Sequence, residues 1–328
     1  MIKKIVLTLG LVVIATLVFI SFFIISTVKN ASLPGRNYNF LLLGLDPRDD
    51  AIEKTETTDT IIFASFNFEK RYLSITSLPR DLWNFSTGTK INQIYPNSLK
   101  SNSTPDFNKI RKEFTPIIGQ KIDSILIITT REIAEIVDIL GGVSLFLENS
   151  IIDNHYPNPD YILHPNPKTP VYITVQFPAG ENIINGSNVI PFVRSRKSSD
   201  NPILGGTDLG RINRQQQLID AIIKKIGDIR RLKPVEIYHL TKRLNRFWHT
   251  AIFKDINDQT LLALALKFAL SSPPSIPISL SRSTLPIEDV GTSGIIYHPE
   301  KFNTGAWVFI PRANDYQEIH QFIQKQIN

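Results

Sequence analysis

Three short apolar runs, each bounded by turn-forming residues, follow one another near the start of the chain. They cover residues 40–45, 60–66 and 72–78 and are rich in β-branched and aromatic side chains. Runs of this length and composition predict β-strands. Residues 67–70 predict a hairpin between the second and third strands. We therefore expect three neighbouring strands, with the middle one antiparallel to both others.

Charged residues stand at the ends of these predicted strands. Asp46 follows the first, Asp59 opens the second, and Arg80 follows the third. Antiparallel pairing would gather all three at one edge of the sheet. Carboxylates suit a divalent cation, and a guanidinium binds phosphate through two parallel hydrogen bonds. The alternative is that these residues serve turn geometry alone.

Helical spacing of apolar residues begins further along the chain. Residues 107–118 and 132–140 predict helices, and a buried strand is expected between them at 124–128. Gly141-Gly142 should end the second helix before another strand at 143–147. Strand, helix and strand in succession predict a β-α-β unit with parallel pairing. The fold class is therefore α/β, with a sheet covered by helices.

Other stretches give weaker patterns. We expect surface loops at 82–109 and 151–169, which are rich in Asn, Ser, Thr or Pro. Residues 232–270 look mainly helical. The closing part of the chain predicts a Pro/Ser loop at 271–278, a strand at 307–311 and an amphipathic helix at 316–327.

The N-terminal run Ile5–Val28 is almost wholly apolar and carries no charge. It is long enough to span a bilayer. The flanking lysines slightly favour a cytoplasmic N-terminus. We expect residues 1–4 in the cytoplasm, 5–28 as a transmembrane signal anchor, 29–36 as a tether and 37–328 as an extracytoplasmic domain. A cleaved signal peptide is the alternative.

Composition narrows the possible chemistry. Hydrophobic residues make up 42% of the 328 residues, which supports a packed core, and cysteine is absent. Disulfides, a thiol nucleophile and cysteine metal sites are therefore excluded. The six histidines form no ligand pair at helical spacing. The net charge is +6 without interleaved aromatic and basic residues, so nucleic acid is not an expected partner.

A second group of basic residues begins at Arg194. The run ending at Val193 predicts a strand, on which Arg194 and Arg196 would point the same way. The Gly/Ser-rich insert 197–207 follows, and Asp208 is a suitable N-cap for the next helix.

The helix after Asp208 carries further polar residues in its first turns. Arg211, Arg214 and Gln215 are three or four residues apart, so they can share one face. Arginines near a helix N-terminus are suited to bind an anion. The cluster predicts an anion site, and a solvated basic face is the alternative.

An ordered set of short motifs between about residues 39 and 226 resembles the LytR-CpsA-Psr family. The motifs are Leu43-Gly44-Leu45-Asp46, Asp59-Thr60, Ser77-Leu78-Pro79-Arg80-Asp81, Lys90-Ile91-Asn92, Gly141-Gly142-Val143, Pro191-Phe192-Val193-Arg194-Ser195-Arg196 and Asp208-Leu209-Gly210-Arg211 with Arg214-Gln215. Each is weak alone, whereas the ordered set is specific.

The resemblance implies a membrane-anchored bacterial cell-wall transferase on a three-layer α-β-α sandwich with a mixed central sheet. Such an enzyme moves a glycopolymer from a polyprenyl-pyrophosphate carrier to a peptidoglycan sugar hydroxyl, with Mg²⁺. Asp46 and Asp59 would hold the metal. The residues implied or predicted to bind pyrophosphate are Arg80, Lys90, Arg194, Arg196, Arg211, Arg214 and Gln215. Those expected to act in catalysis are Asp59, Arg80, Arg194, Arg196 and Arg211.

Two features depart from the family pattern. The 197–207 insert is longer than usual, which leaves the position of Asp208 open, and Thr129-Thr130 replaces an acidic-aromatic pair. The general base is not evident, with Asp59 and Asp208 as candidates. We expect the lipid tail between the sheet and either the 132–140 helix or the helix continuing from Leu218.

Three other functions remain open at this point. The nearest is a hydrolase that releases the polymer to water. The second is a non-catalytic protein that binds lipid pyrophosphate, and the third is a membrane-tethered transcription regulator. Sensitivity to EDTA separates an enzyme from a binder, and dependence on a sugar acceptor separates a transferase from a hydrolase.

Overall fold

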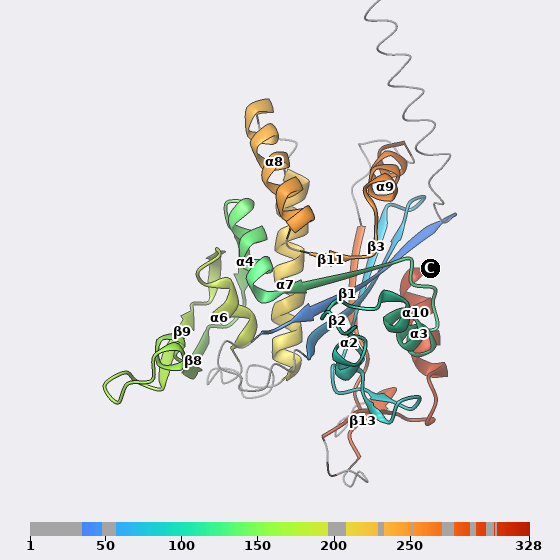
Figure 1. Cartoon of the computed structure of the whole chain (residues 1–328), viewed down its shortest axis with the longest axis horizontal. Helices are drawn as coiled ribbons and strands as arrows, with labels where there is room; N and C mark the ends of the chain where they lie inside the picture. The colour runs from blue at the N-terminus through green and yellow to red at the C-terminus, as the bar shows by residue number, and fades with distance from the viewer. Residues whose placement is uncertain are drawn as a thin grey trace, which may run out of the picture.

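The computed structural model describes residues 35–47, 57–195, 208–228, 233–250, 252–270, 279–288, 293–299, 305 and 307–328. A six-stranded sheet lies at its centre, in the order β11-β6-β1-β2-β3-β12 (Figure 1). The strands are β1 (Asn37–Leu45), β2 (Thr58–Asn67), β3 (Tyr72–Leu78), β6 (Ser124–Thr129), β11 (Phe253–Lys254) and β12 (Ser279–Thr284).

The strand directions make this a mixed sheet. β2 lies antiparallel to both β1 and β3, whereas β6 is parallel to β1 and β12 is parallel to β3. The three predicted strands, their hairpin and the mixed central sheet are therefore confirmed.

The apolar run in β1 supplies both faces of the sheet. Leu41, Leu43 and Leu45 point into one core and are at most 3% exposed, whereas Leu42 and Gly44 line a cavity on the other side. Side chains alternate along a strand, so an uninterrupted apolar run requires cover on both faces. Helices provide that cover.

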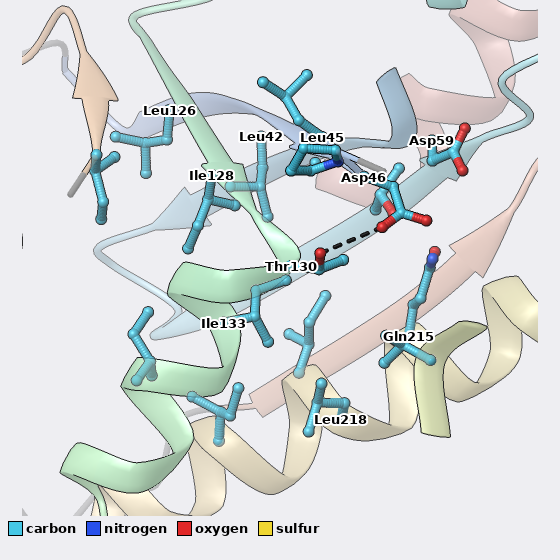
Figure 2. A pocket seen from close by; sticks show the side chains of 18 of the residues that line it. Leu42, Leu45, Asp46, Asp59, Leu126, Ile128, Thr130, Ile133, Gln215 and Leu218 are labelled. Carbon is cyan, nitrogen blue, oxygen red and sulfur yellow. Dashed lines mark hydrogen bonds between the residues drawn. The ribbon is translucent and has the colours of Figure 1, made fainter. Parts of the chain in front are cut away.

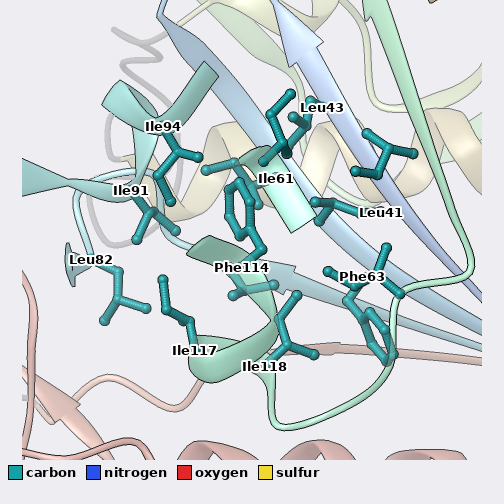
Figure 3. Packing of buried hydrophobic residues seen from close by; sticks show 14 of the residues in the cluster. Leu41, Leu43, Ile61, Phe63, Leu82, Ile91, Ile94, Phe114, Ile117 and Ile118 are labelled. Atoms are coloured by element: carbon teal, nitrogen blue, oxygen red, sulfur yellow. The ribbon is translucent and has the colours of Figure 1, made fainter. Parts of the chain in front are cut away.

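On one face, α3 (Phe107–Ile118) and α10 (Gln317–Ile327) close the main core (Figure 3). Phe114 and Ile117 of α3 are at most 1% exposed. Burying a side chain such as Phe114 stabilises the fold by about 1.5–3 kcal/mol. The Asp106 carboxylate accepts hydrogen bonds from the first turn of α3, and Gly119 ends the helix at φ 70°, as predicted.

The other face is covered by α4 (Thr130–Ile139), α7 (Asp208–Gly227) and α8 (Pro234–Thr250). α4 begins with a reciprocal cap, in which the Thr129 hydroxyl and the Glu132 side chain each bind the other residue's main-chain N–H. α6 (Val189–Arg194) packs against α4 and α7. These helices leave a large cavity between themselves and the sheet.

Smaller elements surround this frame. Near the end of β3 are β4 (Trp83–Asn84), β5 (Thr89–Lys90), η1 (Ile91–Gln93) and α2 (Ile94–Asn97). Beyond α4 are β7 (Val143–Leu147), β8 (Ile151–Pro157), α5 (Pro159–Leu163), β9 (Tyr172–Phe177) and β10 (Gly180–Ile184). The C-terminal third adds α9 (Asp258–Leu270), β13 (Ile296–Tyr297) and β14 (Ile310–Pro311).

The predicted β-α-β unit is only half correct. β6 is parallel to β1, but β7 leaves the central sheet and pairs antiparallel with β10. Gly141 and Gly142 adopt φ values of 74° and 84° between α4 and β7. Such positive φ angles suit glycine because it has no Cβ. The two glycines redirect the chain there, so β7 cannot follow the usual crossover.

Four other sequence predictions are corrected. Residues 82–109 are no surface excursion, because Leu82 and Ile91 are fully buried in the main core. Residues 151–157 form β8 instead of a loop, and Val189–Arg194 forms α6 instead of a strand. A five-residue apolar run cannot distinguish a short helix from a strand by periodicity alone. The late strand is limited to Ile310–Pro311.

Several predictions fall on residues outside the described ranges. These include the Ile5–Val28 anchor, Arg196, the 197–207 insert and the 271–278 loop. Within the described ranges, no helix combines the length and the apolar character that crossing a membrane requires.

Candidate functional site

Asp46 lies directly after β1, at the carboxyl end of the central strand. Its Oδ1 accepts a hydrogen bond from Arg194 Nε at 2.6 Å and another from Arg194 Nη2. The Thr130 hydroxyl, at the start of α4, donates to the same oxygen at 3.2 Å. α6 therefore brings Arg194 to the end of the sheet, as its motif implied.

The charge of Arg194 is secured by this pairing. Burial lowers the pKa of Arg194, but the Asp46 carboxylate and the Tyr156 hydroxyl together raise the pKa above its ordinary value. A buried charge needs such partners, since desolvation otherwise costs several kcal/mol. Arg194 is therefore a fixed positive charge beside the cavity.

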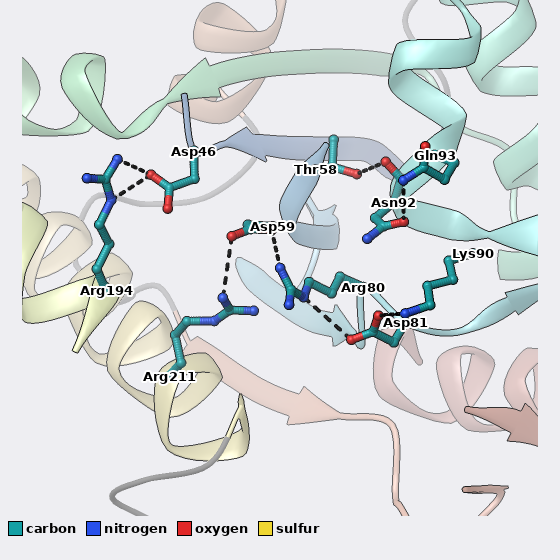
Figure 4. A network of polar contacts seen from close by, with 10 residues as sticks. All are labelled: Asp46, Thr58, Asp59, Arg80, Asp81, Lys90, Asn92, Gln93, Arg194 and Arg211. Atoms are coloured by element: carbon teal, nitrogen blue, oxygen red, sulfur yellow. Dashed lines mark hydrogen bonds and ion pairs between the residues drawn. The ribbon is translucent and has the colours of Figure 1, made fainter. Parts of the chain in front are cut away.

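Asp59 binds two arginines from different elements (Figure 4). Arg80 Nη1, just past β3, donates to Asp59 Oδ1 at 2.5 Å, and Arg211 Nη1 of α7 donates to Oδ2 at 3.4 Å. The Arg211 side chain is only 5% exposed. The expected meeting of Asp59 and Arg80 at one sheet edge thus occurs, and it also recruits Arg211 from far along the chain.

A third carboxylate, Asp81, contacts two basic residues near this group, Arg80 and Lys90. Lys90 Nζ donates to Asp81 Oδ1 at 2.6 Å, and Arg80 Nε lies 3.5 Å from Asp81 Oδ2. Asp81 is 6% exposed. It positions Arg80 and Lys90, and it was not among the predicted site residues.

A cavity of about 1260 Å³ opens beside this charged group (Figure 2). Its charged and polar end contains Asp46, Asp59, Arg194, Arg211 and Gln215. The rest is mainly apolar. One wall comes from the sheet and the other from α4, α7 and α8, including Leu42, Ile62, Leu126, Ile128, Ile133, Ile136, Leu218 and Ile222. The cavity thus lies where the slot for the lipid tail was expected.

Comparison with known proteins identifies the family. The sequence model of the LytR_cpsA_psr family matches residues 25–321. The chain belongs to the LytR-CpsA-Psr family.

Relatives by sequence are distant. Biofilm regulatory protein A of Streptococcus mutans is 26% identical over 203 residues, which cover 60% of this chain and 46% of that protein. The polyisoprenyl-teichoic acid–peptidoglycan teichoic acid transferase TagU of Bacillus licheniformis is 25% identical over 199 residues, covering 58% and 53%. The chain thus spans about half the length of these relatives.

Solved structures show the same fold. TagV of B. subtilis has a TM-score of 0.58 at 17% identity and covers 90% of this chain and 98% of its own. TagT bound to LIIa-WTA has a TM-score of 0.56 at 17% identity, covering 89% and 91%. At such identities the likeness speaks for the fold alone.

In this member of the LytR-CpsA-Psr family, two predicted residues are not brought to the main cavity. Arg214 is 5% exposed and donates from Nε to the Phe192 carbonyl oxygen at 3.1 Å and from Nη2 to that of Ser195. Burial and the charge of Arg211 lower the pKa of Arg214 to about 10. It therefore fixes the end of α6, while Lys90 binds Asp81.

Arg80 lies next to the main cavity without lining it. It lines a small cleft of about 30 Å³, which shares Asp59, Arg211 and Gln215 with the large cavity. Arg196 lies outside the described residues. α7 begins at Asp208, and the predicted capping role of Asp208 stays a prediction.

Sequence reasoning missed two polar groups at the charged end of the cavity. Thr130 binds Asp46, and Tyr156 lines the cavity next to Arg194. Burial raises the pKa of Tyr156, so its hydroxyl keeps its proton. The sequence did distinguish Thr130, because Thr129-Thr130 is the pair that departs from the family pattern. It did not distinguish Tyr156, because its stretch predicted a loop.

The oxygen donors agree with a magnesium site completed by substrate. Among the described residues, no group of three or more His, Cys, Asp or Glu is placed to hold a metal. Asp46 and Asp59 nevertheless line one cavity. Mg²⁺ is commonly bound by one or two carboxylates together with phosphate oxygens and waters. The pair fits that pattern, and metal binding stays a prediction.

Proposed function

We propose that this chain is a membrane-anchored, Mg²⁺-dependent phosphotransferase. Its donor is a glycopolymer on a polyprenyl-pyrophosphate carrier, and its acceptor is a sugar hydroxyl of peptidoglycan. One observation carries the proposal: a single cavity joins a cluster of arginines and carboxylates to a long apolar lining. A phosphorylated head on a long hydrocarbon tail has the complementary shape and polarity.

The arginines suit the pyrophosphate head. Arg194 and Arg211 line the cavity, and Arg80 reaches the adjoining cleft. Each guanidinium offers a planar fork of donors that matches phosphate oxygens. The carboxylates of Asp46 and Asp59 hold these forks in place. Preorganised donors of this kind stabilise charge that develops during transfer.

In the reaction, the acceptor hydroxyl oxygen bonds to the phosphorus that carries the polymer. The bond from that phosphorus to the prenyl phosphate breaks, and the hydroxyl proton passes to a base, for which Asp59 and Asp208 are the candidates. When bound to Asp46 and Asp59, Mg²⁺ supplies positive charge that stabilises the departing phosphate. Positioning and charge neutralisation are the main tasks of a protein in phosphoryl transfer.

The apolar lining suits the prenyl tail. Ile133 and Ile136 of α4 face Leu218 and Ile222 of α7 across the cavity that the sheet closes. Burying a methylene group out of water contributes about 0.8 kcal/mol. Relative to escape into water, a long tail therefore keeps the donor in the cavity, and the head group stays positioned for chemistry.

The proposed membrane anchor is the apolar run at the N-terminus. Ile5–Val28 would form a helix of about 36 Å, which exceeds the bilayer's hydrocarbon thickness of about 30 Å. It would hold the domain on the extracytoplasmic side, where peptidoglycan lies. The names of the teichoic acid transferase relatives agree with this substrate class.

A matched pair of carboxylates tests the proposal. Asp46 with Arg194 and Asp255 with Arg111 are ion pairs of nearly equal exposure, 13% and 30% against 13% and 29%. Asp255 lies outside the large cavity. Asp46→Asn should abolish Mg²⁺-dependent transfer of a prenyl-pyrophosphate glycan to peptidoglycan fragments, whereas Asp255→Asn should retain it.

The same assay discriminates among the alternatives. EDTA should stop transfer by the parent chain. Release of glycan phosphate without an acceptor would identify a hydrolase, and tight binding without turnover would identify a binding protein. Equal transfer by both Asn variants would refute the assignment of Asp46.

A further inference from the structure

Positive charge is concentrated in one short part of the chain. Residues 224–250 contain eight lysines and arginines and two acidic residues, a net charge of +6, which equals that of the whole chain. This stretch comprises the last turn of α7, the connection to α8 and all of α8. Among its described basic residues, Lys225, Lys233, Lys242 and Arg243 are exposed.

Large apolar side chains are exposed on the same elements. Val235 and Tyr238 of α8 are 66% and 61% exposed, and Ile226 of α7 is 49% exposed. On α9, Leu261 and Leu262 are 37% and 40% exposed. Ile226, Leu261 and Leu262 also line the cavity, so its mouth is rimmed by apolar groups that face water. We call this surface of α7, α8 and α9 the rim face.

The outer side of α8 has the pattern of a helix that lies on a membrane. Val235, Tyr238, Lys242 and Arg246 follow one another at intervals of three and four residues, so they share one side. Exposed apolar groups next to a basic helix favour an interfacial position, where the apolar groups enter the acyl region and the cations meet lipid phosphates.

The path of the chain sets the rim face near the bilayer. Lys267 of α9 donates from Nζ to the carbonyl oxygen of Gly35 at 2.5 Å, just before β1. In Figure 1, α9 lies beside the start of β1, and α8 extends into the upper part of the view on the other side of the sheet's top. Seven residue steps separate Val28 from Gly35, which is at most about 25 Å of extended chain. A span formed by Ile5–Val28 would keep α9 within that distance of the membrane.

We infer that the rim face docks on the surface of an anionic bilayer. The mouth of the cavity then meets the lipid phase directly, and a prenyl tail passes from bilayer to cavity without crossing water. This inference rests on the proposed function for the identity of the tail. The docking surface itself is defined by the charge and exposure of α7, α8 and α9.

The absence of cysteine permits a direct test with the full chain. Tyr238→Cys and Trp307→Cys replace aromatic residues of similar exposure, 61% and 58%, on different parts of the molecule. Trp307 is three residues before β14, which pairs with β13, and β13 lies at the bottom of the view in Figure 1, away from α8 and α9. Each variant is labelled with a polarity-sensitive fluorophore and reconstituted into vesicles of phosphatidylglycerol and phosphatidylcholine that contain nitroxide-labelled acyl chains.

Docking predicts strong quenching at position 238 and little at position 307. Leu262→Cys supplies a second label on the rim face and should behave like position 238. Equal quenching at 238 and 307, or no quenching at 238 and 262, would overturn the inference.

Charge provides the second arm of the test. Lys242→Gln, carrying the label at position 238, should weaken docking to anionic vesicles about fivefold, the effect of about one basic residue near such a surface. Lys100→Gln, an exposed lysine outside the rim face, should have no effect. Equal losses in both variants would contradict a role for the basic stripe.

Transfer in detergent separates this inference from the proposed function. Lys242 does not line the cavity, so Lys242→Gln should turn over like the parent chain where no bilayer is present. Transfer without quenching at 238 would reject docking alone. Quenching without transfer would reject the transferase and leave docking in place.

Discussion

Arg211 and Arg214 lie one helical turn apart on α7 and meet different surroundings. Arg211 pairs with Asp59 and lines the cavity. Arg214 donates to main-chain carbonyls of Phe192 and Ser195, which flank Arg194. One arginine lines the cavity that we propose for the substrate, while the other holds the segment that carries Arg194.

These contacts predict opposite profiles for two conservative substitutions. Arg211→Lys should lower turnover by about one to two powers of ten, because lysine keeps the charge and loses a charged hydrogen bond of about 1.5–3 kcal/mol. Arg214→Lys should instead lower the unfolding free energy by about 1–3 kcal/mol, because a buried carbonyl loses its donor. Turnover and denaturant unfolding are measured on both variants. Identical profiles would contradict the division of roles.

At the scale of elements, α4 connects local sequence to the site. Its first turn is fixed by the Thr129 and Glu132 cap, and the next hydroxyl, Thr130, binds Asp46. β1, β3 and β6 run in the same direction, so their carboxyl ends lie at one edge of the sheet. Asp46, Arg80 and Thr130 each follow one of these ends. Ligands bind at such edges because loops and helix starts converge there.

Removing the cap should therefore weaken α4. Thr129→Ala loses the hydroxyl that accepts from the Glu132 N–H, and caps of this kind contribute about 1 kcal/mol. We expect a lower midpoint of thermal unfolding. Thr241→Ala, in the middle of α8, provides the control and should leave stability unchanged or slightly raised, since alanine favours helices. A Thr129→Ala variant as stable as the control would show that the cap adds nothing.

Sequence predicted the elements whose patterns are local. β1 to β3, α3, α4 and α10 carry periodic apolar residues or clear end signals, and their positions agree with expectation. The prediction for α6 was wrong because β-branched residues over five positions resemble a strand. Packing against α4 and α7 instead favours a helix. β7 was predicted correctly as a strand, but its pairing was wrong because its partner, β10, lies more than thirty residues away.

The site was predictable to the extent that it follows strand ends. Asp46, Asp59 and Arg80 could be placed at one edge from three consecutive strands. The separate roles of Arg211 and Arg214 could not, because spacing along a helix limits which side chains share a face and does not name what each contacts. Tyr156 reaches the cavity through β8, whose strand character the sequence did not reveal.

For the whole molecule, β1 connects the surroundings of α9 to the charged end of the cavity. β1 begins next to Gly35 and α9, and it ends at Asp46. Nine residues of strand extend about 30 Å at about 3.3 Å per residue. Asp46 is therefore about 30 Å along β1 from the contact between Gly35 and Lys267 of α9.

A bulky side chain inside the cavity should show whether a long prenyl tail occupies it. Ile136→Trp narrows the cavity midway, whereas Ile226→Trp changes its exposed rim. With a long-tailed donor, Ile136→Trp should lower affinity about tenfold, equivalent to about two methylene contacts at about 0.8 kcal/mol each. A short-tailed donor should be affected less, and Ile226→Trp should change neither by much. Equal losses for both tail lengths would mean that the tail does not occupy the cavity.

The apolar lining has a consequence for the energetics of loading. With the rim face docked as we infer, a tail that moves from the acyl region of a bilayer into the apolar part of the cavity exchanges one hydrocarbon environment for another, so the hydrophobic effect neither opposes nor drives the step. The free energy of capture must then come from the head group, through its contacts with Arg194, Arg211 and their neighbours. In the proposed reaction, the prenyl pyrophosphate gives up the polymer together with one phosphate, and the prenyl phosphate that remains makes fewer of these contacts. We therefore expect the product to return to the membrane without an external source of energy.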